Sequence, residues 1–290
     1  MLIIGQAIEK GTQTVSNTDS QSDLTFIDGF SFPVYASVGF KQQAILAAER
    51  CARAYEFMSN LFSCKLRFQL QILASRDWVS HTDQPTYGMP HFNFLEQRLI
   101  LASEPSDFWR GFAEIIRASS LESYHELQSV YGQEGGQVDL SPFFNLLAVH
   151  ELAHGFHHQG LCDFPRYWLM EFFCNLCLHA YIASIEPEQL PILETAPRLI
   201  AKVDITGLKH RTLADFEMLY TNMDPQNYGW YQAHFHIAAK HIYDTAGVEV
   251  LKALWQTFVI PDALVVDKLR QQVHPSVANI MTMWSGKQMG

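Results

Sequence analysis

The stretch "LLAVHELAHGFHHQG", Leu146 to Gly160, places four histidines and one glutamate inside an apolar run. Within it, His150, Glu151 and His154 form the pattern H-E-x-x-H. Residues four apart lie on one face of an α-helix, so both imidazoles can reach one metal ion, with Glu151 beside a bound water. Because so short a pattern also arises by chance, its neighbours in the sequence must support the metal site.

The flanks of this stretch predict a long helix. Ser141-Pro142 is typical of a helix start, because a hydroxyl caps the first turn and proline suits the first helical position. Gly160 is typical of a helix end. Apolar positions follow at helical spacing on one stripe that the two histidines continue: Phe143, Leu147, His150 and His154. We expect this stripe to face the interior, where buried imidazoles need partners.

A third metal ligand is needed, because catalytic zinc sites use three protein ligands and leave one position for water. The segment "RYWLMEFFCNLCLHAYIAS", which follows Asp163-Phe164-Pro165, predicts a second, antiparallel helix that brings Glu171 back to the histidines. Asn175, one turn later, could accept the outer N–H of a ligand histidine. Asp163 stays open as an alternative third ligand. His157 and His158 are interpreted as helix-end residues that suit the C-terminal dipole.

These motifs resemble the gluzincin metallopeptidases, which include thermolysin and the alanyl-aminopeptidase group. The segment Trp168 to Phe173 is similar to the W-L-x-E-G-F segment of the aminopeptidases, and Asn175 stands at the matching position four after the glutamate. The resemblance covers residues 141–184. Two departures are Phe172 in place of the glycine and a slightly shorter spacing between His154 and the glutamate.

The resemblance implies a zinc-dependent peptidase. Zn²⁺ would be held by His150, His154 and Glu171, one ion per chain, and would activate a water for attack on a peptide or protein substrate. Glu151 would be the general base. The alternative is a non-catalytic metal-binding or partner-binding protein on a peptidase scaffold. Retention of Glu151 favours the enzyme, since a structural metal site has no use for a general base.

The resemblance also implies a substrate cleft. An edge strand beside the zinc would hold extended substrate, and "YGMPHFN", residues 87–93, is the candidate, with Gly88 and His91 in the cleft. Pro90 and His91 stand in place of the glutamate and asparagine of the aminopeptidase segment, whose glutamate grips the free amine of the substrate, which argues against aminopeptidase activity.

The segment "NYGWYQAHFHIAAKHIYDTAG" is similar to the aminopeptidase helix that carries a catalytic tyrosine. Tyr231 matches it best, which implies that this hydroxyl stabilises the transition state. Tyr228 and His234 are its neighbours and further candidates for the cleft.

The order of patterns along the chain predicts an α+β fold, with a small mixed or antiparallel sheet in an N-terminal lobe and a helical C-terminal lobe. Residues 40–62 have a helical stripe, residues 66–73 alternate as a half-buried strand, and residues 86–93 and 96–103 read as further strands. Beyond Pro105 the patterns are helical.

Three regions are expected within the 290 residues. Residues 1–23 form a polar tail, residues 24–160 the N-terminal lobe ending in the H-E-x-x-H helix, and residues 161–290 the helical lobe, the two lobes making one catalytic unit.

Composition narrows the partners and the compartment. The net charge of −10 argues against nucleic acid or an anionic membrane as partner. The five cysteines suggest no disulfide framework, and residues 168–184 read as a buried helix that carries polar side chains. With no signal peptide in the N-terminal pattern, we expect a cytoplasmic protein.

Overall fold

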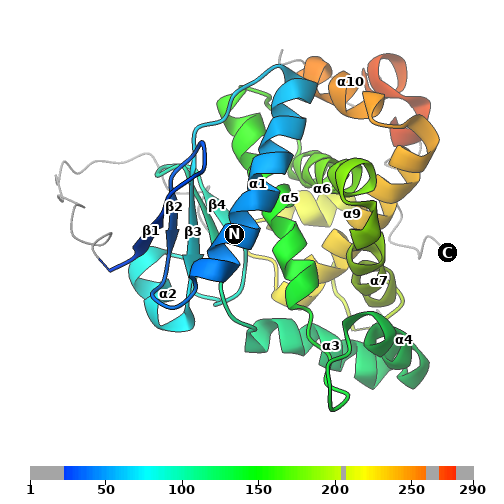
Figure 1. Ribbon diagram of the computed structural model, residues 1–290. Coiled ribbons are helices and arrows are strands. Elements are labelled where there is room, and N and C mark those ends of the chain that lie inside the picture. Colours follow the sequence, from blue (N-terminus) through cyan, green and yellow to red (C-terminus); the bar gives the residue numbers. More distant parts are fainter. Residues whose placement is uncertain (1–22, 204–206, 259–267, 279–290) are drawn as a thin grey trace.

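The computed structural model describes residues 23–203, 207–258 and 268–278 (Figure 1). The fold is α+β and mostly helical, as the order of sequence patterns predicts. One continuous hydrophobic core runs through both expected lobes, from Ile27 to Ala278. The predicted polar tail lies outside the described residues, apart from Asp23.

A five-stranded mixed sheet lies at one side of the molecule (Figure 1). Its strands are β1 (Thr25–Ile27), β2 (Val34–Ala36), β3 (Gln69–Leu73), β4 (His91–Asn93) and β5 (Arg98–Ala102). Their order is β1-β2-β3-β5-β4. The pairs β2–β3 and β3–β5 are parallel, whereas the outer strands β1 and β4 run antiparallel to their neighbours.

Two strand predictions need correction. Residues 66–73 form a strand only from Gln69 onward, and Gln71, expected on a solvated face, is fully buried and accepts a hydrogen bond from Arg98 at 3.1 Å. The strand is central in the sheet, so both of its faces are covered. Residues 86–93 are extended only over β4, which begins directly after Pro90 and lies at the sheet edge, where proline is tolerated.

The helices form the rest of the molecule (Figure 1). They are α1 (Lys41–Phe62), α2 (Ser75–His81), α3 (Asp107–Ser119), α4 (Leu121–Tyr131), α5 (Ser141–Gln159), α6 (Tyr167–Ile185), α7 (Leu190–Ile200), α8 (Leu213–Leu219), α9 (Pro225–Ala246) and α10 (Glu249–Phe258), with short helical turns at Pro187–Gln189 and Leu269–Val273. Helix α5, which carries the H-E-x-x-H pattern, packs against α1, α6, α7, β4 and β5. It therefore joins the sheet to the helical half.

Helix α5 has the predicted bounds but not the predicted cap. It begins at Ser141 and ends at Gln159, one residue before Gly160. The N-cap position is Leu140, which has no side-chain capping bond. The Ser141 side chain instead contacts Asp139, whose carboxylate also accepts from the Ser141 backbone N–H at 2.9 Å. The preceding aspartate thus orders the turn that leads into the helix.

Helix α6 is the central core helix. It begins at Tyr167, two residues after the predicted start at Pro165. Among the described residues it is the one helix long and apolar enough to cross a membrane, but 83% of its apolar window is buried in the protein. Its polar residues Glu171 and Asn175 face the site described below.

A charged clamp ties α1 to the end of α6. Arg50 and Arg53 donate to the Glu186 carboxylate at 2.9 and 2.8 Å, and the Tyr181 hydroxyl donates to the same group. Burial alone would raise the pKa of Glu186, but Arg50, Tyr181 and Arg53 together lower it to about 2. The carboxylate is therefore ionised and multiply bonded, which is the arrangement a buried charge requires.

The edge strand β4 lies directly against α5 because of a glycine. A Cβ at Gly155 would lie 2.7 Å from the ring of Phe92. Gly155 follows His154 in the sequence, so this close packing places β4 beside the two histidines of the H-E-x-x-H pattern.

Candidate metal centre

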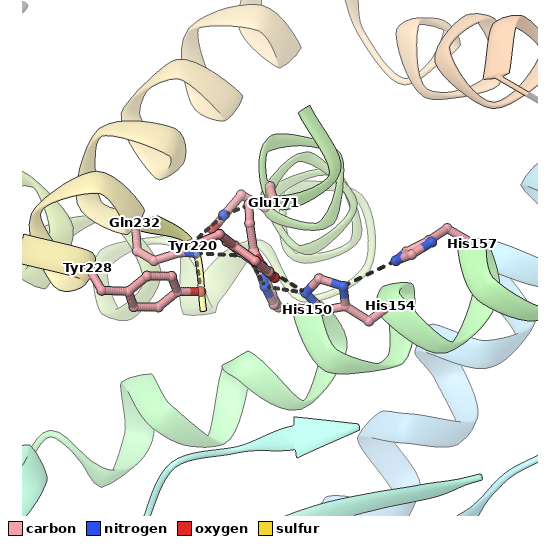
Figure 2. Close-up of polar contacts among 8 residues, drawn as sticks. His150, His154, His157, Glu171, Tyr220, Tyr228 and Gln232 are labelled. Carbon is pink, nitrogen blue, oxygen red and sulfur yellow. Dashed lines mark hydrogen bonds and ion pairs between the residues drawn. The ribbon is translucent and has the colours of Figure 1, made fainter. Parts of the chain in front are cut away.

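Three side chains meet at the centre of the molecule (Figure 2). The Nε2 atoms of His150 and His154 lie 3.1 Å apart. The Glu171 carboxylate approaches them from α6, with Oε2 at 3.2 Å from Nε2 of His150 and Oε1 at 3.6 Å from Nε2 of His154. The predicted antiparallel helix pair brings these residues together, and each is less than a tenth exposed.

The spacing of these atoms fits a tetrahedral metal ion. Ligand atoms at about 2.05 Å from a tetrahedral zinc lie roughly 3.3 Å from one another. The observed separations of 3.1, 3.2 and 3.6 Å bracket that value. Two imidazole nitrogens and one carboxylate are also ligand types that zinc prefers. The side chains therefore have the chemistry and the spacing to hold one zinc ion.

Glu171 is held as an anion. Burial alone would raise the pKa of this carboxyl, but His154 and His150 lower it well below its ordinary value. The Tyr220 hydroxyl donates to Oε1 at 2.5 Å and Gln232 Nε2 donates to Oε2 at 2.8 Å. A metal ligand must be deprotonated, so these donors prepare the carboxylate for binding while fixing its plane.

His154 contacts His157, a residue of the last turn of α5 that the sequence did not suggest as part of the site. Its Nδ1 lies 3.2 Å from Nε2 of His157, one turn along α5 (Figure 2). Burial lowers the pKa of His157 well below its ordinary value, so this imidazole is neutral and can accept the Nδ1 proton of His154. That tautomer leaves the Nε2 lone pair of His154 free for a metal. The i, i+3 spacing was the available signal.

Asn175 does not orient a histidine, contrary to expectation. Its Nδ2 donates to the Glu171 carbonyl at 2.9 Å and to Gln232 Oε1 at 2.8 Å. It thereby orients Gln232, which in turn donates to the Glu171 carboxylate. Gln232 of α9 engages only the NH₂ group of this amide, and Oδ1 of Asn175, the atom expected to accept from a ligand histidine, is buried without a hydrogen-bond partner among the described residues. Nδ1 of His150 is buried without a hydrogen-bond partner among the described residues.

The alternative ligands differ in their placement. Asp163 is exposed, its backbone N–H is bound to the Phe258 carbonyl, and it does not line the cleft, so it is not the third ligand. Cys174 is an alternative third ligand that the structure does allow, because its sulfur lies within 4.8 Å of ligand atoms of both histidines. Burial raises the pKa of the Cys174 thiol well above its ordinary value, whereas Glu171 is already ionised and faces the cleft. We therefore favour Glu171.

The triad opens into a cleft of about 270 Å³. Phe143 and Leu147 of α5 belong to its apolar wall, and Phe143, His150 and His154 are all buried, so the stripe faces the interior as predicted and borders this cleft. The cleft also contains Glu151 and strand β4. Burial raises the pKa of the Glu151 carboxyl, an effect that His154 and His150 oppose. A carboxyl with a raised pKa beside metal ligands is suited to accept and return a proton.

The tyrosine prediction selected the wrong position. The Tyr231 ring is fully buried, its hydroxyl donates to the Thr212 carbonyl at 2.7 Å, and it does not line the cleft. Tyr228, one turn earlier, lines the cleft and its hydroxyl contacts Gln232 (Figure 2). Burial, together with Glu171 and Glu151, raises the pKa of Tyr228 well above its ordinary value, so it stays protonated.

Of the other residues proposed for the cleft, His91 lines it and Gly88 does not. His91 lines the cleft, but Nε2 is 2.6 Å from the Thr82 hydroxyl and Nδ1 is 3.0 Å from the Met89 carbonyl, so both nitrogens are engaged. Gly88 lies outside it, with φ +94° and its carbonyl bound to the Trp109 indole at 2.7 Å. That geometry makes it a turn residue.

His234 also lies outside the cleft and lines a different cavity between α7 and α9. Its Nδ1 is 2.9 Å from the Trp230 carbonyl one turn earlier. The sequence analysis did not find Tyr220, which lies in the loop after α8 and reaches the site only through tertiary packing. Gln232 had a local signal, because it lies one turn after Tyr228 on the same helix face.

No family model, no curated protein and no solved structure matches this chain. The functional argument therefore depends on the geometry and chemistry of the site itself.

Proposed function

We propose that the protein is a zinc-dependent metallopeptidase. The observation that carries the proposal is the triangle of His150, His154 and Glu171 on the floor of a cleft that also contains Glu151. A structural metal site is closed by protein ligands, whereas a catalytic site keeps a position open. Here three ligands converge and the cleft supplies access.

Each side chain has a role in peptide hydrolysis. A zinc ion held by the triad would lower the pKa of a water and polarise the substrate carbonyl. Glu151 accepts a proton from this water as the oxygen bonds to the carbonyl carbon. It then gives the proton to the leaving nitrogen as the carbon–nitrogen bond breaks. Tyr228, a protonated hydroxyl in the cleft, is placed to donate to the developing oxyanion.

The cleft wall favours an extended peptide as substrate. Strand β4 is the sheet edge and lines the cleft, so its outer backbone groups can pair with a bound peptide. No lysine or arginine is among the described residues that line the cleft, and Asp83 is the one carboxylate there besides Glu151 and Glu171. These surroundings suit apolar side chains around an internal peptide bond better than a charged chain terminus.

The decisive experiment compares zinc-loaded wild type with Glu151→Gln on an unbiased peptide library. We expect cleavage by the wild type and a loss of about 10²–10⁴-fold in the variant, with zinc content unchanged. Glu114→Gln is the matched control, because Glu114 is an exposed glutamate of α3 paired with Arg117. Bound zinc without cleavage of any peptide would contradict the proposal and favour a non-catalytic metal-binding protein.

A further inference from the structure

A second cavity lies between α7 and α9, above His179 of α6. Its volume is about 360 Å³, and it shares two lining residues, Pro197 and His236, with the cleft. Two adjoining spaces therefore lie beside the packed helices α7 and α9. The proposed peptidase chemistry uses only the first, so the lining of the second needs its own explanation.

Two buried imidazoles line this second cavity without hydrogen bonds. His179 is 2% exposed and His236 is 7% exposed, and neither bonds to another described residue. Each packs against an aromatic ring, Tyr243 for His179 and Phe143 for His236. Buried polar groups in folded proteins are satisfied by protein, water or ligand, so these rings indicate a polar occupant.

The imidazoles are neutral and can therefore donate one N–H each. Burial lowers the pKa of His179 to about 4, with a further contribution from Lys240, and burial lowers the pKa of His236 well below its ordinary value. A neutral imidazole offers a donor and an acceptor, and hydrogen-bond donors at a buried site suit an anionic acceptor.

The charges around the cavity select the sign of that occupant. Arg198, Lys202 and Lys240 line it, against one carboxylate, Glu194. Lys240 lies 3.4 Å from Glu194 and 2.8 Å from Asp244, and Arg198 is paired with Glu126 outside the cavity. Lys202 is the one cation of the lining that forms no ion pair among the described residues.

We propose that the cavity between α7 and α9 binds a small oxyanion, a carboxylate or phosphate group, through His179, His236 and Lys240. The imidazole N–H groups bind its oxygens, and Lys240 and Lys202 of the lining attract its charge. The site uses none of the three candidate metal ligands but adjoins their cleft at Pro197 and His236, and it holds either a free anion or the acidic end of a molecule that reaches across Pro197 from the cleft.

Calorimetric titration of the zinc-loaded protein with phosphate and with succinate tests the site. We expect saturable binding by the wild type, weakened about tenfold in Lys240→Gln because a charge-assisted hydrogen bond is lost. Lys252→Gln is the matched control, since Lys252 is a similarly exposed lysine paired with Glu249 outside the cavity. His179→Phe, which keeps the ring but removes the N–H, should weaken binding without lowering the melting temperature.

The two sources of the anion are distinguished with peptides that have a free or an amidated C-terminus. Tighter binding of the free form by the wild type, but not by Lys240→Gln, assigns the anion to a peptide terminus. Equal binding of both forms, with phosphate binding intact, assigns a free anion. Absence of phosphate and succinate binding, or binding that Lys240→Gln leaves unchanged, overturns the proposal, because phosphate on the zinc itself would not depend on this lysine.

Discussion

Zinc binding should stabilise the fold by an amount that depends on Glu171. The Nε2 atoms of His150 and His154 are 3.1 Å apart and both face the Glu171 carboxylate. A zinc ion satisfies all three ligand atoms at once. At free zinc about 100 times Kd, mass action adds about 2.7 kcal/mol to the free energy of unfolding. For a large domain this raises the melting temperature by about 5–10 °C.

Glu171→Gln removes the anionic ligand while keeping its size. Loss of a group that only orients a metal ligand weakens metal affinity by up to about a hundredfold. If loss of the ligand itself raises the Kd for zinc by at least about that factor, the stabilisation at the same free zinc falls to about 0.4 kcal/mol. The melting shift then falls to about 1 °C. Glu114→Gln, at an exposed site, should keep the full wild-type shift.

The assay is a thermal melt of EDTA-treated protein in zinc buffers, with elemental analysis of the loaded protein. We expect one zinc per chain in the wild type. A Glu171→Gln protein that keeps both zinc and the full shift would refute Glu171 as ligand. If Cys174→Ala loses them instead, the metal is held by His150, His154 and Cys174. A wild type with no zinc-dependent shift would refute the site as a whole.

Three further outcomes follow from the contacts. Tyr228→Phe should lower kcat by about 10²-fold with KM nearly unchanged, whereas Tyr231→Phe should leave kcat unchanged. Steady-state kinetics that show the reverse order would contradict Tyr228 as the donor to the oxyanion. His157→Phe should weaken zinc binding by about 10–100-fold in a competition titration, because the tautomer of its neighbour is no longer fixed, and an unchanged Kd would show that it has no such role. The clamp at Glu186 has a folded pKa of about 2, below its unfolded value, so it stabilises the protein above about pH 4.5 and this stability is lost as the pH falls through 2. Denaturant unfolding should therefore show that, between pH 6 and pH 2.5, the free energy of unfolding falls by about 2 kcal/mol more in the wild type than in Glu186→Gln. If the free energies of unfolding of the two proteins fall in parallel with pH, the clamp is refuted.

The metal ligands could be predicted because their geometry is local. His150 and His154 are one turn apart on α5, so the pitch of the helix alone places both on one face. Glu171 follows after a short connection, and two buried apolar helices joined that closely pack antiparallel. The α+β class could likewise be predicted, because a helical stripe and three strand patterns precede the helical patterns beyond Pro105, and Pro90 marked the sheet edge at β4.

The residues around the ligands were decided by tertiary packing. Tyr228 and Tyr231 are three positions apart on α9, which differ by about 60° around the helix axis. Only the rotation of α9 against α6 determines which hydroxyl reaches the cleft and which one bonds to Thr212. The same rotation brings Gln232 of α9 to the carboxylate of Glu171 and to the NH₂ group of Asn175.

The sequence by itself therefore predicted the helix pair, the candidate ligand set and the proposed general base, because helical periodicity relates near neighbours along one chain. The tertiary structure alone decided which aromatic and amide side chains surround them, and it created the cavity between α7 and α9. That cavity joins Lys240 and Arg198 to His179, residues from three helices whose separation along the chain leaves no periodic signal. Their juxtaposition depends on how the helices pack, which the burial of many side chains determines together.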